Sequence, residues 1–155
     1  MAIIGSLMKT NMVQVGPDAT VAEAARSMAA NEVGAVLVVR NGALAGILSE
    51  RDVVSRVVAE GMDAASTRVS DVATQDVVSV AVDVHLRECA RLLRDKRIRH
   101  LPITEDGKPV GILSSRDFFE FVVEGLEGLV ERSRYDQALG EGDDPYDHLG
   151  GSYGR

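Results

Sequence analysis

The chain has 155 residues, of which 45% are apolar and 26% are charged, and its formal net charge is −7. This length suits one compact domain or two small domains with a shared core, and the apolar fraction excludes a fully disordered chain and a fibre. The acidic balance argues against a nucleic-acid partner, and no apolar run approaches the roughly 20 residues that a membrane-spanning helix needs. Cys89 is the single cysteine, so it cannot form an internal disulfide. We expect a soluble, cytoplasmic protein without a membrane partner.

Hydrophobic periodicity and turn residues divide the first half of the chain into five elements. The capping-box pattern of Thr20 and Glu23 opens an amphipathic helix, and Asn41-Gly42 is typical of a two-residue hairpin turn between strands. Ser49 then caps a second helix. In chain order we expect a strand at 13–15, a helix from 20, strands at 35–39 and 44–48, and a helix from 49 to about 59.

The second half of the chain repeats the first. With an offset of 65 residues, positions 13–58 align without a gap with positions 78–123, and 15 of the 46 pairs are identical. The longest shared block reads GILSERD at 46–52 and GILSSRD at 111–117. Chance does not produce this agreement, so the chain contains two copies of one unit. For the second copy we expect strands at 77–80, 100–103 and 110–113, a helix ending near 96 and a helix from 115.

Each copy predicts the order β-α-β-β-α, an α/β fold of the α+β type. A unit of this size is marginally stable alone, so we expect the two repeats to pack sheet to sheet with pseudo-two-fold symmetry. The expected organisation is a first repeat at 5–59, a connector at 60–75, a second repeat at 76–124 and a C-terminal extension at 125–155. Residues 124–155 carry eight acids against three bases, and we expect disorder from residue 140, where glycines and acids replace aliphatic residues.

Two such units in tandem, each ending in Gly-Ile-Leu-Ser-x-Arg-Asp, resemble a pair of cystathionine-β-synthase-type (CBS) domains, also called a Bateman module. The sequence RHLPI at 99–103, on the middle strand of the second copy, supports this resemblance, which covers about residues 5–123. The resemblance implies a regulatory module without catalysis of its own. Such modules bind adenosine-containing ligands (AMP, ADP, ATP, NAD(H) or S-adenosylmethionine) in clefts between the two repeats.

The Ser-x-x-Asp pattern shared by both copies has two interpretations. Ser49 and Ser114 stand where a strand enters a helix, so their hydroxyls and the free N–H groups of the helix start favour a phosphate. Asp52 and Asp117 can accept hydrogen bonds from ribose hydroxyls, and by resemblance they are the ribose-binding carboxylates of the family. The alternative is a plain helix cap. We favour ligand binding because both copies keep Ser, Arg and Asp while neighbouring positions differ.

The family pattern distributes further residues over two clefts, each of which mixes the two repeats. The first cleft is the one with Ser49 and Asp52, and it is expected to include Val77, Val78, Arg99 and His100. The second cleft is the one with Ser114 and Asp117, and it is expected to include Met12, Val13, Gly34 and Ala35. Core packing is the alternative for the aliphatic positions, while Arg51 and Arg116 either contact phosphate or are simply exposed. Arg99 and His100 of the first cleft align with Gly34 and Ala35 of the second. We therefore expect ligand binding to depend more strongly on phosphate groups in the first cleft than in the second.

Other classes of function find less support in the sequence. An enzyme is disfavoured because His85 and His148 belong to no catalytic motif, and Cys89 falls on the apolar face of a helix, where a core residue is expected. A protein-interaction scaffold that binds no nucleotide is the main alternative, although it would not need Ser-x-x-Asp in both copies. Binding of nucleic acid through the basic run 87–99 is disfavoured by the scarcity of aromatic residues.

The resemblance also implies assembly. Its members commonly form homodimers through helix faces, and a chain without an effector domain would regulate an unidentified protein partner in trans. Residues 124–139 either extend the last helix or pack on a second subunit. The apolar helix residues expected at an interface, unless the core buries them, are Val54, Val57, Val58, Phe118, Phe119, Val122 and Val123.

Overall fold

The structure is a computed structural model and describes residues 4–140. The chain divides after Asp117 into two compact units. The first unit contains both repeats up to the first turn of the last helix, and the second contains the rest of that helix.

The first repeat forms a three-stranded sheet in the order β1-β2-β3, with β1 parallel and β3 antiparallel to the central β2. The capping box is present at the start of its first helix, where the Thr20 side chain accepts a hydrogen bond from the Glu23 N–H. The hairpin turn places Asn41 and Gly42 at φ values of 53° and 79°, the left-handed region that this pair of residues favours. The elements are β1 (Gln14–Val15), α1 (Val21–Ala30), β2 (Ala35–Arg40), β3 (Ala43–Ser49), α2 (Glu50–Val53) and a π-helical continuation, η2 (Val54–Val58).

The second repeat forms a sheet of the same order, β4-β5-β6. Its register copies that of the first sheet at an offset of 65: Ala35 pairs with Ser49, as His100 pairs with Ser114, and both sheets contain one irregularity at the equivalent place. The elements are β4 (Val80–Ala81), α4 (Leu86–Asp95), β5 (His100–Glu105), β6 (Lys108–Ser114) and α5 (Ser115–Gly140). The strand expected at 77–80 begins only at Val80, because residues 77–79 have no pairing partner on β5.

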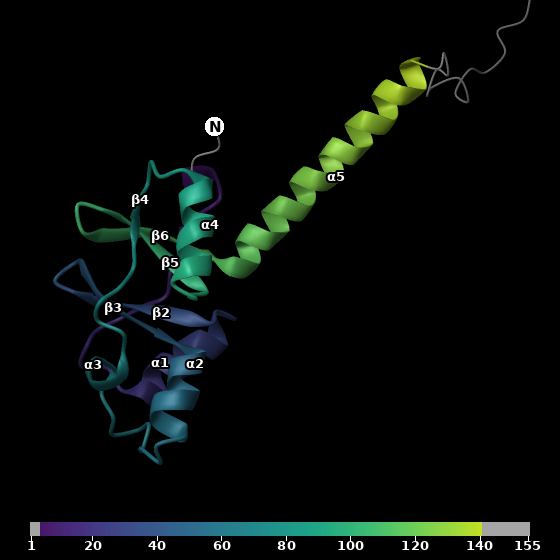
Figure 1. Cartoon of the computed structure of the whole chain (residues 1–155). Coiled ribbons are helices and arrows are strands. Elements are labelled where there is room, and N and C mark those ends of the chain that lie inside the picture. Colours follow the sequence, from purple (N-terminus) through teal and green to yellow (C-terminus); the bar gives the residue numbers. More distant parts are fainter. Residues whose placement is uncertain (1–3, 141–155) are drawn as a thin grey trace, which may run out of the picture. The chain divides into compact units, whose positions relative to one another are not determined.

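The two sheets confirm the predicted fold class. In Figure 1 they lie next to each other, with α1 and α2 beside the first sheet and α4 beside the second. The hairpin of one repeat also contacts that of the other, since the Leu44 N–H donates to the Gly107 carbonyl at 3.0 Å. Fully or almost fully buried side chains form the interior; among them are Val21, Val36, Leu37 and Leu48 of the first repeat and Cys89, Leu101, Ile103 and Leu113 of the second. Burial raises the pKa of the Cys89 thiol, which fits the core role expected for it.

Each repeat is also bound by the segment that leads into the other repeat. Thr74 precedes β4 of the second repeat, yet it exchanges two backbone hydrogen bonds with Ile47 on β3 of the first, both 2.9 Å. Lys9 precedes β1 of the first repeat and exchanges two with Ile112 on β6 of the second, both 3.0 Å. Between the repeats, the connector contains one short helix, α3 (Val69–Val72). These crossed segments bring the start of each repeat beside the Ser-x-x-Asp of the other.

The last helix continues through the segment that we expected either to extend it or to pack on another subunit. α5 has 26 residues and ends at Gly140. The remainder of the segment expected to be disordered, 141–155, lies outside the described residues. Within residues 4–140, no helix combines the length and apolar character needed to cross a bilayer.

Candidate functional site

A cavity of about 370 Å³ lies at the first cleft. Its walls come from both repeats: β3, α2 and η2 on one side, and the segment before β4 and the start of β5 on the other. Seven of the residues expected from the sequence line it, namely Ser49, Arg51, Asp52, Val77, Val78, Arg99 and His100. Seven further lining residues were not anticipated, namely Ile47, Ser55, Arg56, Thr74, Asp76, Arg97 and Ile98.

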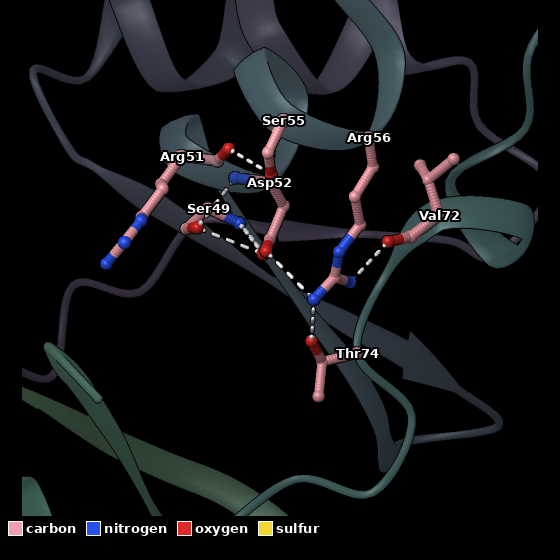
Figure 2. A network of polar contacts seen from close by, with 7 residues as sticks. All are labelled: Ser49, Arg51, Asp52, Ser55, Arg56, Val72 and Thr74. Atoms are coloured by element: carbon pink, nitrogen blue, oxygen red, sulfur yellow. Dashed lines mark hydrogen bonds and ion pairs between the residues drawn. The ribbon is translucent and has the colours of Figure 1, made fainter. Parts of the chain in front are cut away.

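Ser49 and Asp52 form a reciprocal cap at the start of α2, as Figure 2 shows. The Asp52 N–H donates to Ser49 Oγ at 3.2 Å, and Asp52 Oδ2 accepts from the Ser49 N–H and the Ser49 hydroxyl, both at 2.9 Å. The capping interpretation is therefore correct for this structure. It does not exclude a ligand, because the cap orients both polar groups along one wall of the cavity.

Arg56 completes the polar network and is a residue that the sequence analysis missed. Its Nη2 lies 3.1 Å from Asp52 Oδ1 and 3.1 Å from Thr74 Oγ1, and its Nη1 donates to the Val72 carbonyl at 2.7 Å. Figure 2 shows its guanidinium group reaching from η2 to the connector. The only signal in the sequence was a difference between the repeats, since Phe121 occupies the equivalent position in the second copy.

Three other arginines make the first cleft cationic. Arg51, Arg97 and Arg99 all line the cavity, and none of them has an ion-pair partner within residues 4–140. Figure 2 shows the Arg51 side chain directed away from the Ser49–Asp52–Arg56 network. Unpaired guanidinium groups around a concave surface suit a ligand with phosphate oxygens, which they can bind with two parallel hydrogen bonds.

His100 lies at the junction of the two repeats. A Cβ at Gly34 would stand 3.3 Å from its Nε2, so glycine at this position leaves the imidazole room. Burial lowers the pKa of His100 below its ordinary value, and the charge of Arg99 acts in the same direction, against the carboxylates of Glu50, Asp117 and Asp52. At neutral pH this lowered pKa favours the neutral imidazole at the cavity wall, and a nearby anion would favour its protonated form.

Ser114 and Asp117, which the sequence assigned to a second cleft, keep the cap but have a different cation. Ser114 and Asp117 form the same reciprocal bonds, with the Ser114 hydroxyl 2.6 Å from Asp117 Oδ2, while Lys9 Nζ lies 2.5 Å from Asp117 Oδ1. Burial works to raise the pKa of Asp117, but the Lys9 ammonium and the Ser114 donors outweigh it and hold the pKa below its usual range. Lys9, like Arg56, was missed by the sequence analysis.

The other residues expected in the second cleft have mixed environments. Val13 packs against the first repeat's core and accepts a backbone hydrogen bond from Leu37, and Ala35 is buried in β2, so core packing accounts for both. Met12 is half-buried, and Gly34 lies against His100, a residue of the first cleft. Arg116 is exposed on the first turn of α5.

Comparison with known proteins supports the family suggested by these features. The model of the CBS domain family matches the chain twice, at residues 4–59 and 69–124, and these matches cover well over half of the chain. The chain belongs to the CBS domain family.

Two relatives and one solved structure illustrate the similarity. The CBS domain-containing protein YhcV of Bacillus subtilis is 36% identical over 117 residues, which are 76% of this chain and 83% of that protein. The mitochondrial CBS domain-containing protein CBSX3 of Arabidopsis thaliana is 36% identical over 126 residues, and the match covers 77% of this chain but only 61% of the relative. The structure of a CBS domain protein of Pyrobaculum aerophilum complexed with AMP has a TM-score of 0.70 and 28% identity, covering 75% of this chain and 89% of that one.

The environment of His100 predicts how the stability of this CBS pair depends on pH. Its folded-state pKa lies below the ordinary value of 6.5, so the unfolded chain binds the proton more readily. The stability that neutral His100 contributes is present above about pH 6.5 and is lost as the pH falls through that value toward the folded-state pKa. Urea unfolding between about pH 7.5 and 5.5 should therefore show a shallower loss of stability in His100→Gln than in the natural chain. The exposed His85→Gln variant is the control, and equal slopes in His100→Gln and the natural chain would contradict the prediction.

Proposed function

We propose that this CBS pair is a non-catalytic regulatory module that binds an adenine nucleotide in its first cleft and modulates a protein partner in trans. One observation carries the proposal: the Ser-x-x-Asp cap shares the wall of one cavity with Arg51, Arg97 and Arg99, none of which has an ion-pair partner among the described residues. The AMP bound to the Pyrobaculum relative supports the ligand class. ADP, ATP, NAD(H) and S-adenosylmethionine are alternatives that the experiment below separates.

The proposed pose follows the chemistry of the walls. The adenine ring packs on Val77, Val78 and Ile98, the ribose hydroxyls donate to Asp52, and the phosphate lies between Ser49 and the arginines. A carboxylate offers about four acceptor positions, and three of those on Asp52 are occupied, two by Ser49 and one by Arg56. When the Ser49 hydroxyl turns to a phosphate, a second position becomes free, so that both ribose hydroxyls find an acceptor. Phosphate and ribose binding are thereby linked.

The second cleft is proposed as the weaker site for phosphate-rich ligands. At the positions equivalent to Arg97, Arg99 and His100 the first repeat has Glu32, Gly34 and Ala35. A carboxylate and two small apolar residues replace two guanidinium groups and an imidazole. Since electrostatic attraction in a partly desolvated site depends strongly on such charges, the first cleft should fill first with a polyphosphate.

Thermal unfolding with a ligand panel is the experiment that tests the proposal. The panel comprises AMP, ADP, ATP, NAD+, NADH, S-adenosylmethionine and adenosine, with GMP as the specificity control. A ligand at 100 times its Kd stabilises by about 2.7 kcal/mol, which for a domain of this size shifts Tm by roughly 5–10 °C. The double variant Asp52→Ala/Asp117→Ala should fold and lose the shift. An unchanged affinity in the double variant would overturn the ribose role of both aspartates.

Replacement of Arg99 tests the phosphate side of the cleft. Arg99→Ala should weaken the binding of ATP by about tenfold or more, as expected for the loss of a charge-assisted hydrogen bond. It should weaken the binding of adenosine by far less. Isothermal titration calorimetry with both ligands measures the difference. Equal losses for ATP and adenosine would show that Arg99 is structural.

A nucleotide-independent interaction scaffold is the competing function. The observation in its favour is that a serine cap and a cation of the chain engage both aspartates, so each aspartate has a structural role. Absence of a thermal shift with every member of the panel would favour the scaffold and direct the search to a protein partner.

We also propose that the module is a cytoplasmic homodimer that associates through helix faces. Of the apolar residues expected at an interface, Val57 is buried in the core, whereas Val54, Val58, Phe119 and Val122 are exposed by 61%, 66%, 68% and 40%. Exposed apolar side chains continue along α5 with Leu126, Leu129 and Val130, a spacing of three and four residues that is typical of paired helices. A reducing compartment suits the single buried thiol of Cys89.

Analytical ultracentrifugation tests this assembly. The natural chain should sediment as a dimer, and the double variant Phe119→Glu/Leu126→Glu should be a monomer, because two buried carboxylates would face an apolar partner. Glu120→Gln/Glu127→Gln, on the polar positions of the same helix, is the control. A monomeric natural chain would contradict the proposal.

A further inference from the structure

Each cleft contains a cation that lies against Oδ1 of its aspartate, the oxygen that the serine cap does not use. In the first cleft this is the guanidinium of Arg56, 3.1 Å from Asp52 Oδ1, and in the second it is the ammonium of Lys9, 2.5 Å from Asp117 Oδ1. In both clefts the inner oxygen, Oδ2, belongs to the serine cap. The side chains of Asp52 and Asp117 are only 17% and 11% exposed, whereas those of Arg56 and Lys9 are 44% and 66% exposed, so in each pair a largely buried carboxylate meets a cation that reaches in from the surface.

The two cations are not equivalent residues. Arg56 aligns with Phe121 in the second repeat, and Lys9 aligns with Thr74 of the connector. In space, however, both cations lie beside the aspartate of a Ser-x-x-Asp cap. Arg56 extends from η2 and donates to Thr74 on the segment bridged to β3. Lys9 is itself the equivalent of Thr74, on the segment bridged to β6. The repeats have diverged in sequence here, yet each retains one cation on the aspartate and a connection to the segment that enters the facing repeat.

The hydrogen bonds determine what such a cation does. The cap orients a carboxylate through one oxygen only, and rotation about the Cβ–Cγ bond would break it. A second bond to Oδ1 removes the remaining rotational freedom of the carboxylate. It leaves one acceptor position of Oδ1 open toward a ligand.

We propose that Arg56 and Lys9 are positioning residues, which hold the aspartates of the first and second clefts, respectively, in the orientation that accepts ribose hydroxyls. This inference rests on the proposed binding of a nucleotide. It makes each cleft depend on the crossed segment of the chain, because Arg56 also donates to the Val72 carbonyl and Lys9 pairs its backbone with Ile112.

A cycle between residue and ligand tests the role of Arg56. The full chain carries Asp117→Ala so that only the first cleft is measured, and calorimetry gives the Kd of AMP and of 2′-deoxy-AMP. With Arg56 present, loss of the ribose hydroxyl should weaken binding by roughly tenfold, since a hydrogen bond to a charged acceptor is lost. In Arg56→Gln the ratio of the Kd of 2′-deoxy-AMP to the Kd of AMP should fall toward one, and Arg56→Lys should restore part of this ratio. Arg68→Gln, which removes an exposed ion pair with Asp18, should leave the ratio unchanged.

The outcomes separate the inference from the function on which it rests. If Arg56 were merely structural, Arg56→Gln would weaken the binding of AMP and of 2′-deoxy-AMP equally. The ratio of the two Kd values would then be unchanged, and this result would overturn the inference. Tighter AMP binding in Arg56→Gln would also overturn it, because Arg56 would then be a competitor that the ribose displaces. If AMP binds with Arg56 present but shows no preference over 2′-deoxy-AMP, the proposed ribose role of Asp52 itself fails.

The role of Lys9 has a test that needs no ligand. Its ammonium contributes to the lowered pKa of Asp117, so Lys9→Met should raise that pKa, measured from the carboxyl ¹³C shift as a function of pH. In an Asp52→Ala chain, Lys9→Met should also reduce the ratio of the Kd of 2′-deoxy-AMP to the Kd of AMP at the second cleft. An unchanged pKa of Asp117 would show that Lys9 does not hold the carboxylate.

Discussion

Crossed backbone pairing ties the two repeats together and brings their clefts into being. Thr74 pairs with Ile47, and Lys9 pairs with Ile112, so each repeat holds the entry segment of the other. Without these bridges the start of the second repeat would not be held beside the Ser49 cap, and the cavity would lose one wall. The first cleft is therefore a property of the pair, since the first repeat supplies Ser49, Asp52, Arg51 and Arg56, while the second supplies the valines before β4 and the basic residues at the start of β5.

The two repeats share their strand pairing but differ in the residues that face the clefts. The antiparallel pairing of the central strand with the last strand is identical in the two sheets at an offset of 65, including the irregularity in the central strand. The facing residues differ: Arg97, Arg99 and His100 border the first cleft, whereas Glu32, Gly34 and Ala35 hold the equivalent positions. Under the proposed function, this difference in charge is a physical basis for two nucleotide affinities within one chain.

The observed helix cap and the proposed ligand-binding role of the Ser-x-x-Asp motif are compatible. In this structure it is a helix cap, and the cap supplies the orientation that a binding role requires. Binding would redirect the serine hydroxyl toward a phosphate without dismantling the cap, because the Ser49 N–H still donates to Asp52. A motif that already satisfies the helix start can gain a ligand at little structural cost.

Periodicity, capping patterns and the Asn41-Gly42 turn are local signals, so the repeat, the order of strands and helices and the hairpins could be predicted from the sequence. The seven expected residues around the cavity followed from the resemblance to CBS domains. The identity of the cations beside the aspartates and the burial of some expected site residues depend instead on how distant segments pack. Arg56 and Lys9 lie at non-equivalent positions of the alignment, so they are not among the residues that the two copies share. The difference between Arg56 and Phe121 does not by itself reveal that the guanidinium reaches Asp52. Val13 and Ala35 were assigned by packing, which depends on neighbours distant in the chain. Side-chain reach and burial are properties of the assembled pair, and they are absent from any single segment.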